Sequence, residues 1–320
     1  MYVPLDEWRA VLERDYLSTF VPAGGAAVKF AITAAFAPAA DIGGYLEPLA
    51  DRHDLAYFSL DGATTRLHMI DQLFHALARQ VDWDGLAGAL VRQLLAADGF
   101  VLPAPPEPCH YGRIAELSGT SEPEVRRRTR TLLHEKVEQD YAMTREFRLA
   151  MLRLCQAALE PSAAELPEIS AIHGWLRGEL RQVSLLKPAG IFQKIGRHLA
   201  RDMFLSLAHW LRLTGKRGTL LVLDITRYSL ERRSSEPDGL LFYSTTAVVD
   251  VYEVLRQFID ACDELEGCLI ITIAPTAFLT DEKRGLAKYT ALRLRIWDEV
   301  RDRQRANPLS SLVRLAGAGT

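Results

Sequence analysis

The sequence lacks several patterns that would assign it at once to a known class of protein. Its four cysteines form no CxxC pair and no obvious disulfide framework, which favours reduced thiols in a cytosolic protein. Its histidines show no HxxxH or HExxH spacing, so we expect no metal site. No apolar run approaches the ~20 residues that a membrane span requires, and the acidic start of the chain is unlike a basic signal peptide. We therefore expect a cytoplasmic protein with no membrane partner.

The composition is that of an ordinary globular chain. Of the 320 residues, 48% are hydrophobic and 25% are charged, and the formal net charge is -3. A chain of this length can bury a large core in one domain or two. The near-neutral balance gives no global attraction to nucleic acid or membranes, so any such binding must come from a local patch.

Short β-prone runs alternate with helical patterns along the chain. We expect strands at residues 28–32, 55–61, 219–225 and 268–275 and in the LVRL segment near the end, and helices at residues 5–16, 65–97, 247–265 and 288–303. Residues 111–210 have an almost entirely helical pattern. Buried strands separated by helices indicate a parallel sheet that is covered on both faces, which predicts an α/β fold with a large helical insertion.

The predicted domains follow from this order. Residues 1–100 are expected to form the N-terminal part of a P-loop-like α/β core, and residues 214–320 its C-terminal part. Residues 101–213, which begin at a proline-rich stretch, are expected to form the helical insertion.

The segment that follows the first predicted strand lacks the residues of a phosphate-binding loop. Residues 33–40 read TAAFAPAA, where a Walker A loop would read G-x-x-x-x-G-K-[ST]. Thr33 stands in place of the first glycine, Pro38 of the second, Ala39 of the lysine and Ala40 of the hydroxyl residue. Proline also removes one of the backbone N–H groups that would cradle phosphates. We therefore expect no cofactor, with ATP and Mg²⁺ bound only if this degenerate site still functions.

The acidic strand of the predicted core is incomplete in a similar way. Asp224 ends the run TLLVLD, where an aspartate would organise Mg²⁺ in an ATPase. An ATPase of the additional-glutamate type would have glutamate next, to polarise the attacking water, but Ile225 stands there. Asp224 is therefore a remnant at most, and aspartates also commonly end strands and cap the following turn.

Residues 248–300, from VVDVYEVLRQ to LRIWDEV, resemble the BrxD-like ATP-binding proteins of BREX-type phage-defence systems. The resemblance extends to residues 133–154, to HGWLRGEL and to LLVLD, and so covers most of the chain. It implies a P-loop fold of the AAA+/ORC-like class and partners such as an ATPase, a helicase or a methyltransferase of the same system. The chain departs from that family at residues 33–40 and at Ile225-Thr226, which implies degenerate Walker A and Walker B motifs.

A helix-turn-helix pattern lies within the predicted insertion. Ala115 is small enough for two helices to touch, Gly119 suits the turn, and Val125 would anchor the second helix on the first. The second helix carries four arginines that could meet the phosphates of duplex DNA, namely Arg126, Arg127, Arg128 and Arg130. The alternative is a solvated basic helix without a DNA partner.

The C-terminal part holds residues that a nucleotide site or a neighbouring subunit could use. Thr276 follows a strand at the position of a sensor residue for the γ-phosphate. Arg284, Arg293 and Arg295 could act in trans on the nucleotide of a neighbour in an oligomer, or could be ordinary surface and ion-pair arginines.

The sequence thus favours a degenerate, non-hydrolysing ATPase-like subunit of a phage-defence complex. Such a subunit would act as a scaffold, bind DNA or complement an active neighbour. Two alternatives stay open: an active ATPase with an atypical nucleotide site, and a helix-turn-helix DNA-binding regulator.

Overall fold

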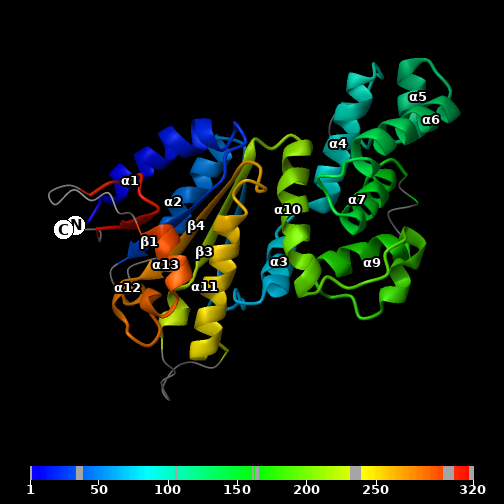
Figure 1. Cartoon of the computed structure of the whole chain (residues 1–320). Helices are drawn as coiled ribbons and strands as arrows, with labels where there is room; N and C mark the ends of the chain where they lie inside the picture. Colours follow the sequence, from blue (N-terminus) through cyan, green and yellow to red (C-terminus); the bar gives the residue numbers. More distant parts are fainter. Residues whose placement is uncertain are drawn as a thin grey trace. The chain divides into compact units, whose positions relative to one another are not determined.

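The computed structural model describes residues 2–33, 39–104, 107–160, 162, 166–230, 239–297 and 306–316. The chain divides into two compact units (Figure 1). An α/β unit comprises residues 1–77 and 216–320, and a helical unit comprises residues 78–215. The sequence predicted an insertion that begins at residue 101, whereas the helical unit also takes in the segment from residue 78.

The α/β unit is built on one five-stranded sheet in which every pair of neighbouring strands is parallel. The strands are β1 (Ala27–Thr33), β2 (Leu55–Asp61), β3 (Gly218–Asp224), β4 (Cys268–Pro275) and β5 (Leu312–Arg314). Their order across the sheet is β2-β3-β4-β1-β5. β3 and β4 are buried along almost their whole length because helices cover both faces of the sheet. This mixed α/β arrangement is consistent with a P-loop NTPase-like fold and confirms the predicted fold class.

The two faces of the sheet have separate hydrophobic cores. The helices of this unit are α1 (Leu5–Val11), η1 (Leu12–Phe20), α2 (Ala39–Arg52), α3 (Ile70–Ala78), η4 (Thr226–Ser229), α11 (Thr245–Asp260), α12 (Ala277–Thr280), η5 (Leu286–Lys288) and α13 (Thr290–Ile296). One core joins α1, η1 and α2 to Val222 and Ile271 of the sheet. On the other face Phe30 stacks on Phe278 of α12, whose ring meets Tyr252 of α11 edge to face. Side chains alternate along each strand, so one apolar run supplies both cores.

Lys29 is the one charged residue in the middle of β1, and it is buried. Its ammonium donates to the carbonyls of Leu309 at 2.7 Å and Ser310 at 2.9 Å, and lies 4.6 Å from the centre of the Tyr16 ring. Burial lowers the pKa of Lys29 to about 8. The side chain thereby ties the segment before β5 and the N-terminal helices to the centre of the sheet.

The helical unit packs around large aromatic side chains. Its helices are α4 (Trp83–Ala97), α5 (Tyr111–Ser118), α6 (Glu122–Leu133), η2 (His134–Glu138), α7 (Arg145–Ala157), α9 (Pro167–Leu176), η3 (Val183–Ala189) and α10 (Arg197–Leu213). The ring of Phe147 on α7 meets Trp83 of α4 and Trp210 of α10 edge to face, with ring centres 6.1 Å and 6.3 Å away. These contacts explain why α4 belongs with the helical unit, although the sequence placed it in the α/β core.

Two predicted helices differ from the structure. The expected helix over residues 65–97 is divided into α3 and α4, because Asp82 caps α4 by accepting a hydrogen bond from the N–H of Gly85 at 3.0 Å. The expected helix over residues 288–303 begins at Thr290, and α13 ends at Ile296. Residues 298–305 lie outside the described residues.

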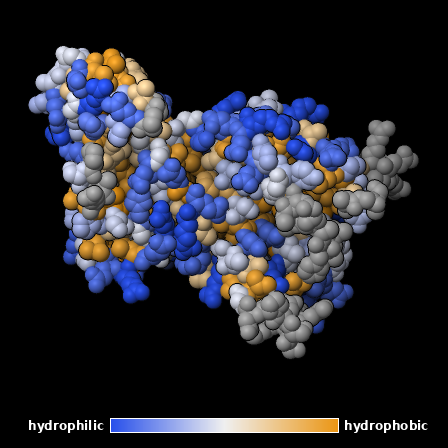
Figure 2. Space-filling model, turned by 180° about the vertical axis from the view of Figure 1, so that it is seen from behind, coloured by the Kyte–Doolittle hydropathy of each residue, from blue (hydrophilic) through white to orange (hydrophobic). Residues whose placement is uncertain are grey.

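The visible surface is largely hydrophilic, with smaller hydrophobic areas between the polar ones (Figure 2). None of the described helices is long and apolar enough to cross a membrane.

Candidate functional site at the carboxyl edge of the sheet

All five strands are parallel, so their carboxyl ends meet at one edge of the sheet. Ligands of open α/β sheets bind outside this edge. Thr33 ends β1 and is the register partner of Pro275 at the end of β4, while Asp61 ends β2 and is the register partner of Asp224 at the end of β3. The edge therefore presents two neighbouring carboxylates beside two strand ends without charge.

Each of the two carboxylates is engaged by its own turn. Asp224 accepts a hydrogen bond from the N–H of Thr226 at 2.8 Å, and Asp61 accepts one from the N–H of Ala63 at 2.6 Å. Burial raises the pKa of Asp224, the bonds from Thr226 act in the opposite direction, and the nearby charge of Asp61 raises it further. Among the described residues, no group of three His, Cys, Asp or Glu side chains is arranged to hold a metal ion. The structure thus places Asp224 where the sequence expected it, in the role of a turn cap.

The residue after Asp224 belongs to the core. Ile225 is only 1% exposed, and its N–H donates to the carbonyl of Ile273 on β4 at 2.9 Å. A carboxylate at this position would have to leave the core or be buried without a partner, which is costly. The residue that follows β3 at this edge is therefore an aliphatic side chain of the core.

The predicted phosphate-loop residues lie around the end of β1. Thr33 is the last residue of β1, and α2 begins at Ala39, so a strand precedes the predicted loop segment and a helix begins at its end. Pro38 lies outside the described residues, and the side chains of Ala39 and Ala40 are likewise not described. The carbonyl of Thr33 accepts hydrogen bonds from the N–H of Thr276 at 3.1 Å and from its hydroxyl at 3.2 Å. The predicted sensor residue thus joins the end of β4 to the end of β1.

Arg284 is directed into its own unit. Its guanidinium donates to the carbonyl of Tyr243 at 2.8 Å and to that of Tyr228 at 3.3 Å, and its own carbonyl accepts a bond from the hydroxyl of Tyr252 at 2.6 Å. These contacts favour a structural role in holding the segments that follow β3.

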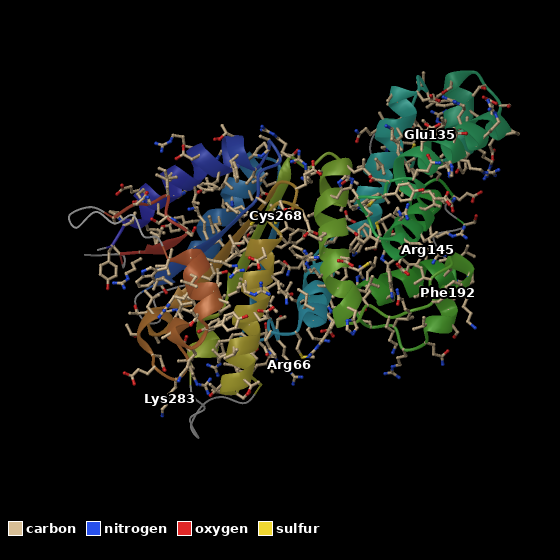
Figure 3. The ribbon with its side chains drawn as sticks, in the orientation of Figure 1. Arg66, Glu135, Arg145, Phe192, Cys268 and Lys283 are labelled. Carbon is tan, nitrogen blue, oxygen red and sulfur yellow. The ribbon has the colours of Figure 1, made fainter. Side chains whose placement is uncertain are left out.

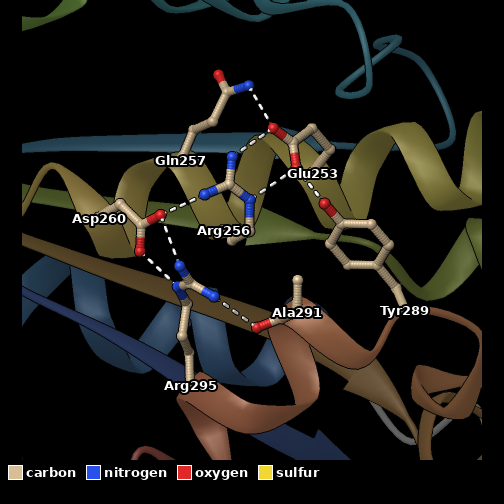
Figure 4. Close-up of polar contacts among 7 residues, drawn as sticks. All are labelled: Glu253, Arg256, Gln257, Asp260, Tyr289, Ala291 and Arg295. Atoms are coloured by element: carbon tan, nitrogen blue, oxygen red, sulfur yellow. Dashed lines mark hydrogen bonds and ion pairs between the residues drawn. The ribbon is translucent and has the colours of Figure 1, made fainter.

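The other two predicted trans arginines lie on α13 and differ from each other. Arg295 donates to both oxygens of Asp260 on α11, at 2.5 Å and 3.0 Å (Figure 4). Asp260 belongs to a hydrogen-bonded network that also contains Glu253, Arg256, Gln257 and Tyr289. The hydrogen bonds to Glu253, of which that from Arg256 has the largest effect, lower the pKa of Glu253 to about 2. Arg293 is exposed and forms no ion pair with a described residue. Unlike Arg295, it is therefore not held by a described carboxylate.

The sequence did not predict the aromatic cluster that lies beside Asp61 and Asp224. The rings of Tyr228 and Tyr243 stack with centres 3.8 Å apart, and the hydroxyl of Tyr243 donates to the carbonyls of Gly62 and Thr65 at 2.5 Å and 3.0 Å. A side chain at Gly62 would lie 2.9 Å from the carbonyl oxygen of Asp224, so only glycine fits. In the sequence, the Asp-Gly pair at residues 61–62 indicated only the end of a strand. The residue that bonds to this turn, Tyr243, is 181 residues from Gly62 and 178 residues from Thr65 in sequence.

In the helical unit, α5 and α6 meet as a helix pair. Ala115 and Val125 are buried between them, and Gly119 ends α5 in the left-handed conformation with φ of 62°. These are the three positions that the helix-turn-helix pattern singled out.

Three of the four arginines predicted to contact DNA are engaged by acidic residues. Arg126 pairs with Glu122 at 2.8 Å and Glu160 at 2.5 Å, Arg127 pairs with Glu124 at 2.6 Å, and Arg128 donates to Asp98 at 2.9 Å. Arg130 is exposed and pairs with no described residue. The basic face of α6 is therefore largely neutralised within its own unit.

Comparisons with known proteins agree with the α/β architecture. A sequence model of the family described as BREX system ATP-binding protein BrxC/D matches residues 112–318, more than half of the chain. No curated protein and no solved structure matches the chain.

Proposed function

The chain belongs to the BREX system ATP-binding protein BrxC/D family, and from this premise we propose that it does not itself hydrolyse ATP. Membership makes it an ATPase-related component of a phage-defence system, with other components of that system as partners. The observation that carries the proposal is the end of β3, where the buried Ile225 follows Asp224. A hydrolytic site needs a group that orients and activates water, and an aliphatic side chain in the core cannot supply it.

The sequence between β1 and α2 supports the same proposal. Residues 33–40 contain no lysine and no glycine, so they offer neither a charge for the phosphates nor the flexible backbone of a phosphate cradle. Asp224 adds to the argument because its carboxylate already accepts a hydrogen bond from the N–H of Thr226 at 2.8 Å. Nucleotide binding at this edge is therefore expected to be weak or absent.

A subunit without turnover would contribute by assembly. α13 offers a surface for a partner, because the ion network with α11 fixes the helix while Leu294 and Trp297 stay 70% and 42% exposed. Exposed apolar side chains on a fixed helix are common at protein interfaces. Arg293, beside Leu294, is the arginine that could reach the nucleotide of an active neighbour in trans.

The test is calorimetric titration of the full chain with ATP and with ADP in the presence of Mg²⁺, together with an assay of phosphate release. We expect no binding heat at millimolar nucleotide and no phosphate release above the buffer blank. The variant Asp224→Asn should behave as the wild type, and so should the control Asp250→Asn, which changes an exposed carboxylate of α11.

The opposite result would be equally clear. Micromolar binding with turnover that disappears in Asp224→Asn and persists in Asp250→Asn would establish an active ATPase with an atypical site. That outcome would overturn the proposal.

A further inference from the structure

The longest basic stretch without a compensating acid lies in the helical unit, between α9 and α10. Residues 180–201 contain no aspartate and no glutamate, but they contain five lysines and arginines. Four of these, Arg181, Lys187, Lys194 and Arg197, are exposed and form no ion pair with a described residue. Unlike α6, this stretch leaves its positive charge available to a partner.

The stretch is held in place by the core of its unit. Leu186 and Ile191 are fully buried, and Ile195 is 4% exposed. The indole N–H of Trp175 on α9 donates to the carbonyl of Gln193 at 2.9 Å. These anchors fix the backbone on both sides of the exposed residues, so a partner would meet a surface that is already organised.

Phe192 is exposed in the middle of this fixed backbone. Its side chain is 65% exposed, although that of its neighbour Ile191 is buried. The turn before it requires Gly190, whose φ is 76° and whose Cβ, if present, would contact Leu149. Single exposed apolar side chains are common on protein surfaces, but an aromatic ring among cations can serve as a stacking platform for a planar ligand.

Arg145 adds a further charge from the start of α7. Its guanidinium donates to the carbonyl of Gly190 at 3.4 Å, which brings it next to Phe192 (Figure 3). Two acids lie nearby, but neither pairs with a cation of this stretch: Glu146 accepts a bond from the side-chain amide of Gln193 at 2.9 Å, and the carboxylate of Glu179 lies 3.7 Å from the guanidinium of Arg79. Together with Arg145, the exposed cations and Phe192 of this stretch form what we call the 181–197 surface. Its six residues are Arg145, Arg181, Lys187, Phe192, Lys194 and Arg197.

The start of α10 is also positively charged and contains no acidic residue. Gly196 precedes the helix and offers no side-chain acceptor to its first N–H groups, and the first turn contains no acidic residue. The helix begins instead with Arg197, which is unfavourable beside the positive end of the helix dipole unless an anion is present. A phosphate would satisfy both the N–H groups and the side chains.

From these observations we propose that the 181–197 surface binds single-stranded nucleic acid. The cations would contact successive phosphates, and a base would stack on the ring of Phe192. A single strand fits better than a duplex because its bases are free to stack on an aromatic side chain, whereas duplex bases stack on one another. The proposal is independent of whether the carboxyl edge of the sheet binds ATP.

The test is fluorescence anisotropy of the full chain with a labelled oligothymidylate of about 20 nucleotides and with a duplex of the same length, at salt concentrations from about 50 to 200 mM. The triple variant Lys187→Ala/Lys194→Ala/Arg197→Ala should lower the slope of log K against log salt by about 2, at roughly 0.7 per lost phosphate contact. Phe192→Ala should weaken single-strand binding about tenfold while it leaves the slope unchanged.

The matched control is Arg126→Ala/Arg127→Ala/Arg128→Ala, which removes the same charge from α6, with folding of every variant checked by circular dichroism. It should leave the slope nearly unchanged. Absence of binding by the wild type, equal losses in the two triple variants, or tighter duplex binding with no effect of Phe192→Ala would each overturn the proposal.

Discussion

α6 and the 181–197 surface are both basic and lie in the same helical unit, but three of the four arginines of α6 are paired with carboxylates, whereas the cations of the 181–197 surface pair with no described carboxylate. On α6 the guanidinium groups of Arg126, Arg127 and Arg128 each meet a carboxylate of the same unit. On the 181–197 surface the cations have no such partner among the described residues. The number of positive residues in a segment therefore says less about binding than the position of the nearest negative ones.

The difference follows from spacing along the chain. Residues three and four apart meet on the surface of a helix, and in α6 the acids Glu122 and Glu124 precede Arg126 and Arg127 by four and three residues. Residues 180–201 contain no acid, and they run through η3 and the turn after it to the first turn of α10. Local spacing thus supplies part of the pairing on α6, and the more distant acids Asp98 and Glu160 supply the rest.

The largest expected effect is a difference in stability between substitutions at two adjacent residues, the buried Ile191 and the exposed Phe192. Ile191→Ala should lower the free energy of unfolding by about 3 kcal/mol, because it leaves a cavity in the core. Phe192→Ala should change it by less than about 0.5 kcal/mol, because the ring is 65% exposed. Urea denaturation of both variants measures the difference. Similar losses would mean that the ring of Phe192 packs in the fold and is not a contact surface.

The next prediction removes the contrast by freeing the arginines of α6. In the variant Asp98→Asn/Glu122→Gln/Glu124→Gln, Arg127 and Arg128 lose their acidic partners and Arg126 loses one of its two. This variant should bind nucleic acid about tenfold more tightly at low salt, and the slope of log K against log salt should rise by up to about 2. Anisotropy with the same oligonucleotide measures both quantities.

A variant of equal net charge controls for the overall field of the protein. Asp263→Asn/Glu264→Gln/Glu266→Gln changes three exposed carboxylates of the α/β unit. It should change the slope much less than the α6 variant. If the two variants bind equally tightly, long-range attraction explains the gain and the ion pairs of α6 do not matter for binding.

Much of the fold could be predicted from the sequence because the strands are short, continuous apolar runs. The runs expected at residues 55–61, 219–225 and 268–275 became β2, β3 and β4 with boundaries within one residue of those expected. The division at Asp82 was missed, because a capping aspartate within a long helical pattern is easily taken for one more polar residue.

The candidate site was harder to predict than the sheet. Asp224 and Ile225 could be placed because the first ends a strand and the second follows it directly, and the family match supports the ATPase-related identity. The stacked tyrosines beside them could not be foreseen, because Tyr228 and Tyr243 meet across separate segments. The ion pair of Arg128 with Asp98 joins residues 30 apart, which no helical spacing indicates. Contacts of this kind depend on tertiary packing, so sequence patterns alone identified a basic helix whose charge is already engaged.

The smallest expected effect is a pH dependence that distinguishes the paired arginines from the free ones. The hydrogen bond from Arg128 holds the pKa of Asp98 below its usual value, so this pair stabilises the fold above about pH 4 and loses its contribution as the pH falls through the folded-state pKa. Arg128→Ala should therefore be less stable than the wild type at pH 6, with the difference shrinking toward pH 3. Arg197→Ala should show no such trend, since no described carboxylate pairs with it. Urea denaturation across this pH range measures both variants, and a parallel trend in Arg197→Ala would show that its charge is engaged after all.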